Sequence, residues 1–332
     1  MGTDMGTRSR RQPGAVAGRK PAVDYLRISI TNRCDFRCRY CMPPSGVELK
    51  RHADIVTYEE IVRFTEAAVA AGITRVRVTG GEPLVRRQCP ELIARLACLP
   101  GITDLALTTN GSRLARFAAG LKAAGLRRIN ISIDSLEPER FAAITGGGSL
   151  DAVLAGLERA LELGFDPVKV NVVMQAGIEK DLEAFVALAR ELPVHVRFIE
   201  HMPVGRNFSG AWRYVSREEL LVKLSGFGEL TAAAAPVGAG PARYYRFAGH
   251  AGTLGFITSM SSHFCGVCNR LRLTADGKLR SCLFSDEEID VRPLIAGPPS
   301  ALAAAIRDVI GRKRFDRRPG RPGSRFMSQI GG

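Results

Sequence analysis

Six short runs rich in β-branched residues alternate with helix-like segments between residues 25 and 200, and this alternation limits the possible folds. The expected strands span residues 25–30, 74–79, 104–109, 128–134, 168–174 and 194–200. Six β/α units in series predict a parallel sheet, because each helix returns the chain to the same end of the sheet. We expect an α/β fold whose sheet curves into a partial (β/α)6 barrel. An open doubly wound α/β sheet is the alternative.

The remaining segments divide the chain into four expected regions. Residues 1–22 are rich in Gly, Arg and Pro without periodicity, which predicts a disordered leader, and residues 23–230 form the barrel. Residues 231–242 are an Ala/Pro/Gly-rich connector. Residues 243–332 are strand-rich at first and then helical, so we expect a C-terminal α+β extension.

Three cysteines with the spacing C-x3-C-x2-C follow the first expected strand. They are Cys34, Cys38 and Cys41, and Tyr40 stands directly before the last of them. Three thiolates can hold a [4Fe–4S] cluster and leave one iron open for chemistry. A structural zinc site needs a fourth ligand nearby, and the next histidine along the chain is His52. We therefore predict a cluster here; zinc-bound or free thiols are the alternative.

A second group of thiols lies near the C-terminal end, with the spacing C-x2-C-x13-C. Cys265 and Cys268 precede two strand-like runs separated by Asp-Gly, and Cys282 follows them. Asp-Gly between such runs predicts a hairpin, which would return the third sulfur to the first pair. From the residues alone, a second iron–sulfur cluster and a Cys3His zinc site that includes His263 both remain open.

The net charge of +14 is concentrated at the ends of the chain, where residues 1–20 contribute +4 and residues 306–332 contribute +6. The chain lacks the aromatic motifs of RNA-binding modules, so we expect no nucleic-acid partner. It contains no apolar run of membrane-span length and no signal-like apolar core, which predicts a cytoplasmic protein without a membrane anchor. Cysteines grouped as ligands also fit a reducing compartment. Cys89 and Cys98, outside both groups, are expected to pack in a helix.

The chain resembles the radical S-adenosylmethionine (SAM) superfamily in two motifs. These are the CxxxCxxC loop with Tyr40 before its last cysteine, and Gly80-Gly81-Glu82-Pro83 one β/α unit later. The resemblance implies that SAM binds the open iron and is cleaved to methionine and a 5′-deoxyadenosyl radical. It also implies SAM contacts from Tyr40, Gly81, Ser132 and Met202. A small strand residue and a core methionine are the alternative roles of the last two.

The C-terminal thiol group, with Asn269-Arg270 directly after its second cysteine, narrows the resemblance to the GTP 3′,8-cyclases, the molybdenum cofactor biosynthesis protein A family. The match extends from about residue 24 to the terminal Gly-Gly. It implies a second [4Fe–4S] cluster on Cys265, Cys268 and Cys282, whose open iron faces the guanine of GTP. It further implies GTP contacts from Arg27, Arg77, Thr108, Lys169, Arg270, Leu271 and Arg272.

Basic residues on otherwise buried strands independently favour an anionic ligand. Arg27, Arg77 and Lys169 lie in runs that are typical of buried strands. An unpaired cation is costly in such a place, and arginine matches the oxygens of a phosphate. Each cation could instead pair with a structural carboxylate such as Asp134 or Glu200.

The resemblance implies a lyase that converts GTP to (8S)-3′,8-cyclo-7,8-dihydro-GTP, the first step of molybdenum cofactor biosynthesis. Arg27 is expected near the reacting ribose, and Gly331 and Gly332 are expected to reach the active site. The implied partners are an electron donor and a downstream enzyme that takes the product, and either a monomer or a homodimer is compatible. Two other functions remain open. A peptide-modifying radical-SAM enzyme typically carries more auxiliary cysteines, and a non-enzymatic zinc or Fe–S scaffold would not cleave SAM.

Overall fold

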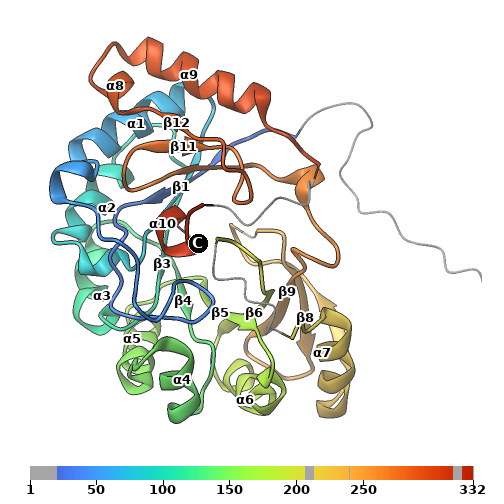
Figure 1. Cartoon of the computed structure of the whole chain (residues 1–332). Coiled ribbons are helices and arrows are strands. Elements are labelled where there is room, and N and C mark those ends of the chain that lie inside the picture. Colours follow the sequence, from blue (N-terminus) through green and yellow to red (C-terminus); the bar gives the residue numbers. More distant parts are fainter. Residues whose placement is uncertain (1–20, 206–212, 239, 317–323, 332) are drawn as a thin grey trace, which may run out of the picture.

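One curved β-sheet runs through the computed structural model, which describes residues 21–205, 213–238, 240–316 and 324–331. Its six central strands are parallel and follow the chain order: β1 (Tyr25–Ser29), β2 (Arg75–Thr79), β3 (Asp104–Thr109), β4 (Arg128–Ser132), β5 (Val168–Met174) and β6 (Val194–Glu200). A doubly wound sheet reverses its strand order at a switch point, and this sheet does not. The sheet is curved and does not close, so the expected partial barrel is confirmed (Figure 1).

Helices cover the outer face of this sheet (Figure 1): α1 (Tyr58–Ala70), α2 (Cys89–Ala97), α3 (Leu114–Ala123), α4 (Pro138–Thr145), α5 (Leu150–Glu162) and α6 (Leu182–Glu191). The local sequence begins them as expected, since Thr57 and Glu60 form the capping box of α1 and Pro138 occupies the first turn of α4. Their apolar sides pack on outward-facing strand residues such as Leu26 and Val76 in one core. The alternate strand residues face inward and line the barrel.

The C-terminal region adds strands to both edges of the barrel sheet. The added strands are β7 (Leu230–Ala233), β8 (Arg243–Phe247), β9 (Thr253–Ile257), β10 (Arg270–Leu273), β11 (Lys278–Arg280) and β12 (Ile289–Asp290). β9 pairs in parallel with β6, and β10 pairs in parallel with β1. β10 and β11 form the expected hairpin. Residues 258–269 therefore span the gap between the two edges of the barrel.

The remaining helices are α7 (Arg217–Leu224), α8 (Arg292–Ile295), α9 (Pro299–Arg312) and α10 (Met327–Ile330). α9 agrees with the helical pattern near the C-terminal end and packs beside α1. α10 lies at the centre of the view in Figure 1, so the last residues return to the interior of the barrel. Among the described residues, no helix is both long enough and apolar enough to cross a membrane.

Two details differ from the expectations. The expected connector 231–242 begins inside strand β7, because residues 231–233 pair with β8. Pairing with β8 stabilises this strand, since its own Ala-rich sequence has a low strand propensity. Cys98 does not pack in a helix either: it is the exposed C-cap of α2, on the side away from the core, whereas Cys89 is fully buried as expected. Most of the expected leader, residues 1–20, lies outside the described residues.

Candidate active site

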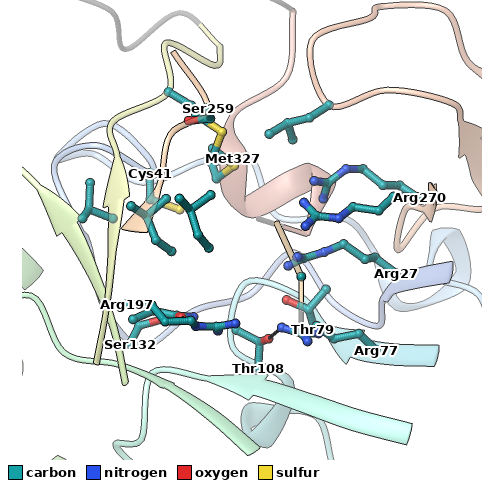
Figure 2. Close-up of a pocket in the computed structure, with 18 of the residues that line it drawn as sticks. Arg27, Cys41, Arg77, Thr79, Thr108, Ser132, Arg197, Ser259, Arg270 and Met327 are labelled. Atoms are coloured by element: carbon teal, nitrogen blue, oxygen red, sulfur yellow. Dashed lines mark hydrogen bonds between the residues drawn. The ribbon is translucent and has the colours of Figure 1, made fainter. Parts of the chain in front are cut away.

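A cavity in the barrel interior brings together most of the predicted site residues. Both thiol groups line it: Cys34, Cys38, Cys41, Cys265, Cys268 and Cys282. The predicted SAM residues also line it: Tyr40, Gly81, Ser132 and Met202. Five of the predicted GTP residues do so as well: Arg27, Arg77, Thr108, Arg270 and Arg272. Figure 2 shows Arg27, Arg77 and Arg270 on one side of this space and Cys41 on the other.

Three arginines stand side by side on adjacent strands at one level of the barrel. The parallel register places Arg27 of β1 opposite Arg77 of β2 on one side and opposite Arg272 of β10 on the other. Neighbouring strands lie about 4.8 Å apart, so the three guanidinium groups enter the same space. Burial, and then repulsion by Arg272 and Arg77, hold the pKa of Arg27 well below its ordinary value. A row of like charges in a buried space favours an anionic ligand.

The carboxylates that could have neutralised these cations are engaged elsewhere. Asp134 accepts a hydrogen bond of 2.7 Å from the Tyr40 hydroxyl. Glu200 accepts one of 2.8 Å from the Tyr214 hydroxyl and two more from the backbone N–H groups of residues 260–261. Within the described residues, five cations in or beside the cavity form no ion pair with a carboxylate: Arg77, Lys169, Arg197, Arg270 and Arg272.

Two predicted GTP residues do not line the cavity. Lys169 is fully buried on β5, and its ammonium donates a hydrogen bond of 3.2 Å to the Val237 carbonyl. Burial, and then repulsion by Arg197 and other arginines, lower the pKa of Lys169 to about 6. Leu271 lies in the hydrophobic core on the opposite face of β10, because side chains alternate along a strand. The Leu271 side chain therefore points away from the cavity, and the GTP contact predicted for this residue, which its backbone would have to make, stays a prediction.

Arg197 of β6 lines the cavity but was not singled out from the sequence. It is buried, and its guanidinium donates hydrogen bonds of 2.9 Å to Asn171 Oδ1 and 2.8 Å to Asn130 Oδ1. Burial lowers its pKa to about 10. Figure 2 shows it beside Ser132. The signal was present, because an arginine within an otherwise apolar strand is the same anomaly that drew attention to Lys169.

The Gly-Gly-Glu-Pro loop after β2 lies directly against the loop that leads to the first cysteines. The backbone N–H of Gly81 donates to the Thr31 carbonyl at 2.7 Å, and that of Glu82 donates to the Arg33 carbonyl at 2.8 Å. A Cβ atom on Gly81 would stand 2.3 Å from the Arg33 carbonyl oxygen, so only glycine permits this approach. The buried carboxylate of Glu82 also accepts from the backbone N–H of Asn110 at 2.6 Å. The loop is thereby fixed between β1 and β3.

The first thiol group has the chemistry of an iron–sulfur ligand set. Cys34, Cys38 and Cys41 are half-buried and form no disulfide. Burial raises the pKa of Cys34 and of Cys41 to about 12, and that of Cys38 well above its ordinary value. Thiols in such a place become thiolates only beside a compensating positive charge, which iron supplies. The three sulfurs are thus the donor type that a cluster takes, although the described residues contain no three His, Cys, Asp or Glu side chains grouped to hold a single metal ion.

The second thiol group differs in its electrostatics. Burial raises the pKa of the Cys268 thiol, but Lys313 and Arg270 outweigh this and bring the pKa below its ordinary value. Lys313 also donates to the backbone carbonyls of Arg270 and Ser281, which joins the two ends of the β10–β11 hairpin. Among the described residues, no three His, Cys, Asp or Glu side chains are grouped to hold a metal ion. His263 lines the cavity, and the choice between a cluster and zinc stays a prediction here.

The C-terminal segment reaches the carboxyl ends of β1 and β2. Arg272 Nη1 donates a hydrogen bond of 2.6 Å to the Gly331 carbonyl. Gly331 has a φ of +78°, and a Cβ atom there would lie 2.9 Å from Thr79 Cγ2 and 3.0 Å from Ser29 Cβ. A larger residue would not fit between the two strands. The catalytic role of Gly331 stays a prediction, and Gly332 lies outside the described residues.

Two protein-family models together match most of the chain. The model of the radical SAM superfamily matches residues 28–189, which include the end of β1, the strands β2 to β5 and the first thiol group. The model described as Molybdenum Cofactor Synthesis C matches residues 194–318, which include the second thiol group. The division between the two models falls at the start of β6.

Solved structures with a similar fold include that of Streptococcus suis SuiB bound to S-adenosylmethionine. Its TM-score is 0.57 at 14% identity, over 87% of this chain and 68% of that chain. The same protein bound to its precursor peptide SuiA gives a TM-score of 0.59 at 14% identity, over 87% and 67%. At this identity the likeness shows the fold alone.

Curated relatives are far more similar in sequence. The GTP 3′,8-cyclase of Moorella thermoacetica is 47% identical over 93% of this chain and 98% of its own length. Those of Heliobacterium modesticaldum and Pelotomaculum thermopropionicum are both 48% identical, with the same coverage. Identity at this level extends over the barrel and the C-terminal region together, so the chain belongs to the GTP 3′,8-cyclase family of radical SAM enzymes.

Proposed function

We propose that this chain converts GTP to (8S)-3′,8-cyclo-7,8-dihydro-GTP, with cleavage of SAM to methionine and 5′-deoxyadenosine, as the first step of molybdenum cofactor biosynthesis. The observation that carries the proposal is the row of Arg27, Arg77 and Arg272. It faces the same cavity as the Cys34–Cys41 loop. A triphosphate is a polyanion that a row of guanidinium groups can bind, and its ribose would then lie between the arginines and the loop.

Membership of the family implies SAM and an iron–sulfur cluster. We assign the cluster to Cys34, Cys38 and Cys41, whose loop follows β1. When bound there, SAM and the cluster would supply radical chemistry for removal of a hydrogen atom from C3′ of the GTP ribose. The chain itself orients the cofactor: the Gly81 backbone can approach it closely, and Tyr40 is fixed by its hydrogen bond to Asp134. Ser132 and Met202 would complete the SAM contacts.

A second cluster on Cys265, Cys268 and Cys282 is the finer part of the proposal. The cationic surroundings of Cys268 favour its thiolate, as a metal ligand requires. Residues 258–269, which carry two of these thiols, span the gap between β9 and β10. An iron held there would face the cavity from the side of the arginines and could bind the purine.

The remaining roles follow from position in the cavity. Arg77, Arg270 and Arg272 would bind the phosphates, and Thr108 would assist through its contact of 3.4 Å with Arg77. Lys169 lies beside the cavity and would have to leave the Val237 carbonyl to reach a phosphate. Arg27 lies at the centre of the arginine row and is our candidate for the residue nearest the reacting ribose. Gly331 and Gly332 would support turnover from the C-terminal end. The reaction also needs an electron donor and an enzyme that consumes the cyclic product.

Binding of GTP is expected to take up a proton through Lys169. With a pKa of about 6, this ammonium is mostly deprotonated near pH 7.5 in the empty protein, and a nearby phosphate raises its pKa. Protonation of Lys169 is then coupled to GTP binding. The affinity for GTP falls as the pH rises through the pKa that Lys169 has in the GTP complex. Calorimetry of GTP binding in buffers of different ionisation enthalpy should report the uptake. The Lys169→Met protein should bind GTP without this proton uptake. An equal proton uptake in that variant would show that another group takes up the proton.

An anaerobic assay tests the proposal as a whole. The reconstituted protein is mixed with SAM, a strong reductant and each nucleoside triphosphate in turn, and the products are analysed by mass spectrometry. We expect 5′-deoxyadenosine and a cyclised dihydro-nucleotide with GTP alone. If 5′-deoxyadenosine forms without any nucleotide product, the protein cleaves SAM but GTP is not its substrate. Neither product, with both clusters verified by iron content, would favour a non-enzymatic scaffold.

A further inference from the structure

The C-terminal segment 324–331 is anchored by a buried ion pair that lies outside the cavity. Arg325 Nη1 and Nη2 each lie 3.0 Å from one carboxylate oxygen of Asp276, and Nη2 also lies 2.7 Å from Glu288 Oε2. The side chains of Arg325, Asp276 and Glu288 are only 16%, 10% and 18% exposed. A two-pronged contact of this kind fixes both the position and the direction of the arginine.

The carboxylates of this anchor also have partners other than Arg325. Asp276 lies in the β10–β11 turn and accepts a further hydrogen bond of 2.6 Å from the Thr274 hydroxyl. Although burial raises the pKa of Asp276, its hydrogen bonds to Arg325 and Thr274 bring that pKa to about 2. Glu288 is paired with the buried Arg280. The anchor therefore belongs to the hairpin whose β10 strand carries Arg270 and Arg272.

A second set of contacts holds the segment against the loop that follows β6. Gly205 has a φ of +79°, and a Cβ atom there would lie 2.6 Å from the Arg325 carbonyl oxygen. Just beyond, Ile330 is buried in a small core with Val204 and Leu283, and Met202 packs on this core. The segment thus passes between the loop that carries a predicted SAM residue and the hairpin that carries predicted GTP residues.

The path from the anchor to the cavity is short and regular. The chain turns through α10 (Met327–Ile330), and the Gly331 carbonyl that follows accepts a hydrogen bond from Arg272. The Gln329 side chain accepts a hydrogen bond of 2.9 Å from the backbone N–H of Phe326, which fixes the start of α10. Figure 1 shows α10 at the centre of the barrel, and Figure 2 labels Met327 beside Cys41. A displacement at Arg325 is therefore transmitted to the residues that line the cavity.

We infer that Arg325, seated between Asp276 and Glu288, is a positioning residue for turnover. It fixes the C-terminal segment so that Met327 and Ser328 stay in the cavity and the Gly331 carbonyl stays on Arg272, although Arg325 itself does not line that cavity. The inference rests on the proposed function, because it assigns the anchor to that reaction. Without the anchor, the small core and the Gly331 contact remain, so the segment is expected to dock less often rather than to unfold.

The test is Arg325→Gln in the full-length, cluster-loaded protein. We expect kcat for product formation to fall about 10- to 100-fold, as for other displacements of about 1 Å near reacting groups. KM for GTP should change less, because the arginine row is intact. Hydrogen exchange at residues 327–331 should become faster, while the rest of the barrel is unchanged. Arg325→Lys should recover part of both effects. Asp276→Asn combined with Arg325→Gln should add little to the single change.

Arg312→Gln is the matched control, because Arg312 makes a similar two-pronged contact with Asp308 on the exposed face of α9. It should leave kcat and hydrogen exchange unchanged. An Arg325→Gln protein with normal kcat or normal exchange at 327–331 would overturn the inference, as would faster exchange throughout the barrel. If the unmodified protein forms no cyclised product, the proposed function fails, and the exchange measurement alone then decides whether the anchor exists.

Discussion

Cys34→Ser is expected to abolish the formation of 5′-deoxyadenosine from SAM. A serine hydroxyl stays protonated near neutral pH and does not replace a thiolate ligand of the first cluster. The second thiol group is untouched, so the iron content after reconstitution should fall from about eight to about four atoms per chain. Anaerobic assays with a strong reductant, read by mass spectrometry, measure the deoxyadenosine directly.

The control for this change is Cys98→Ser, since Cys98 is exposed at the end of α2 and belongs to neither thiol group. It should retain both the iron content and the activity of the unmodified protein. Deoxyadenosine formed at the normal rate by the Cys34→Ser protein would show that the first cluster is held elsewhere.

Arg77→Gln is expected to raise KM for GTP about 100-fold, the loss of roughly 3 kcal/mol from charge-assisted hydrogen bonds to phosphate. The same change should preserve or increase the stability of the ligand-free protein. Arg77 is buried beside Arg27 and makes no ion pair with a carboxylate among the described residues, so its charge opposes folding until an anion binds. Steady-state kinetics and thermal unfolding measure the two effects.

Arg63→Gln removes the same charge from the exposed face of α1 and serves as the comparison. It should change neither KM nor the unfolding temperature by much. A normal KM for GTP in the Arg77→Gln protein, or a marked loss of stability without GTP, would assign Arg77 a structural role.

The barrel could be predicted from the sequence because its signals are local. Each strand from β1 to β6 is a β-branched run of its own, and residues such as Thr57 and Pro138 mark where helices begin. The first thiols and the Gly-Gly-Glu-Pro loop follow consecutive strands, and consecutive parallel strands end at the same edge of a sheet. The proximity of these two loops could therefore be predicted from the order of the strands in the sequence.

The features that were missed depend on contacts between distant segments. The spacing of Cys265 and Cys268 does not show that β9 pairs with β6 and β10 with β1. Pairing between strands that are distant in the sequence produces no periodic pattern of residues. Alternation along β10 places the Leu271 side chain on the face opposite to Arg270 and Arg272, and the pairing of β10 with β1 decides which face lines the cavity. Arg197 shows that a local anomaly can be present and still be overlooked.

The most direct test of the proposed reaction uses GTP carrying deuterium at C3′ of the ribose. In the proposed reaction that carbon lies between the arginine row and the Cys34–Cys41 loop, and its hydrogen would be transferred to the radical derived from SAM. We predict that each 5′-deoxyadenosine formed with this substrate gains one deuterium, in step with loss of the label from the cyclised product. Deoxyadenosine without deuterium, alongside a nucleotide product that keeps the label and so has no new bond at C3′, would contradict the proposed reaction.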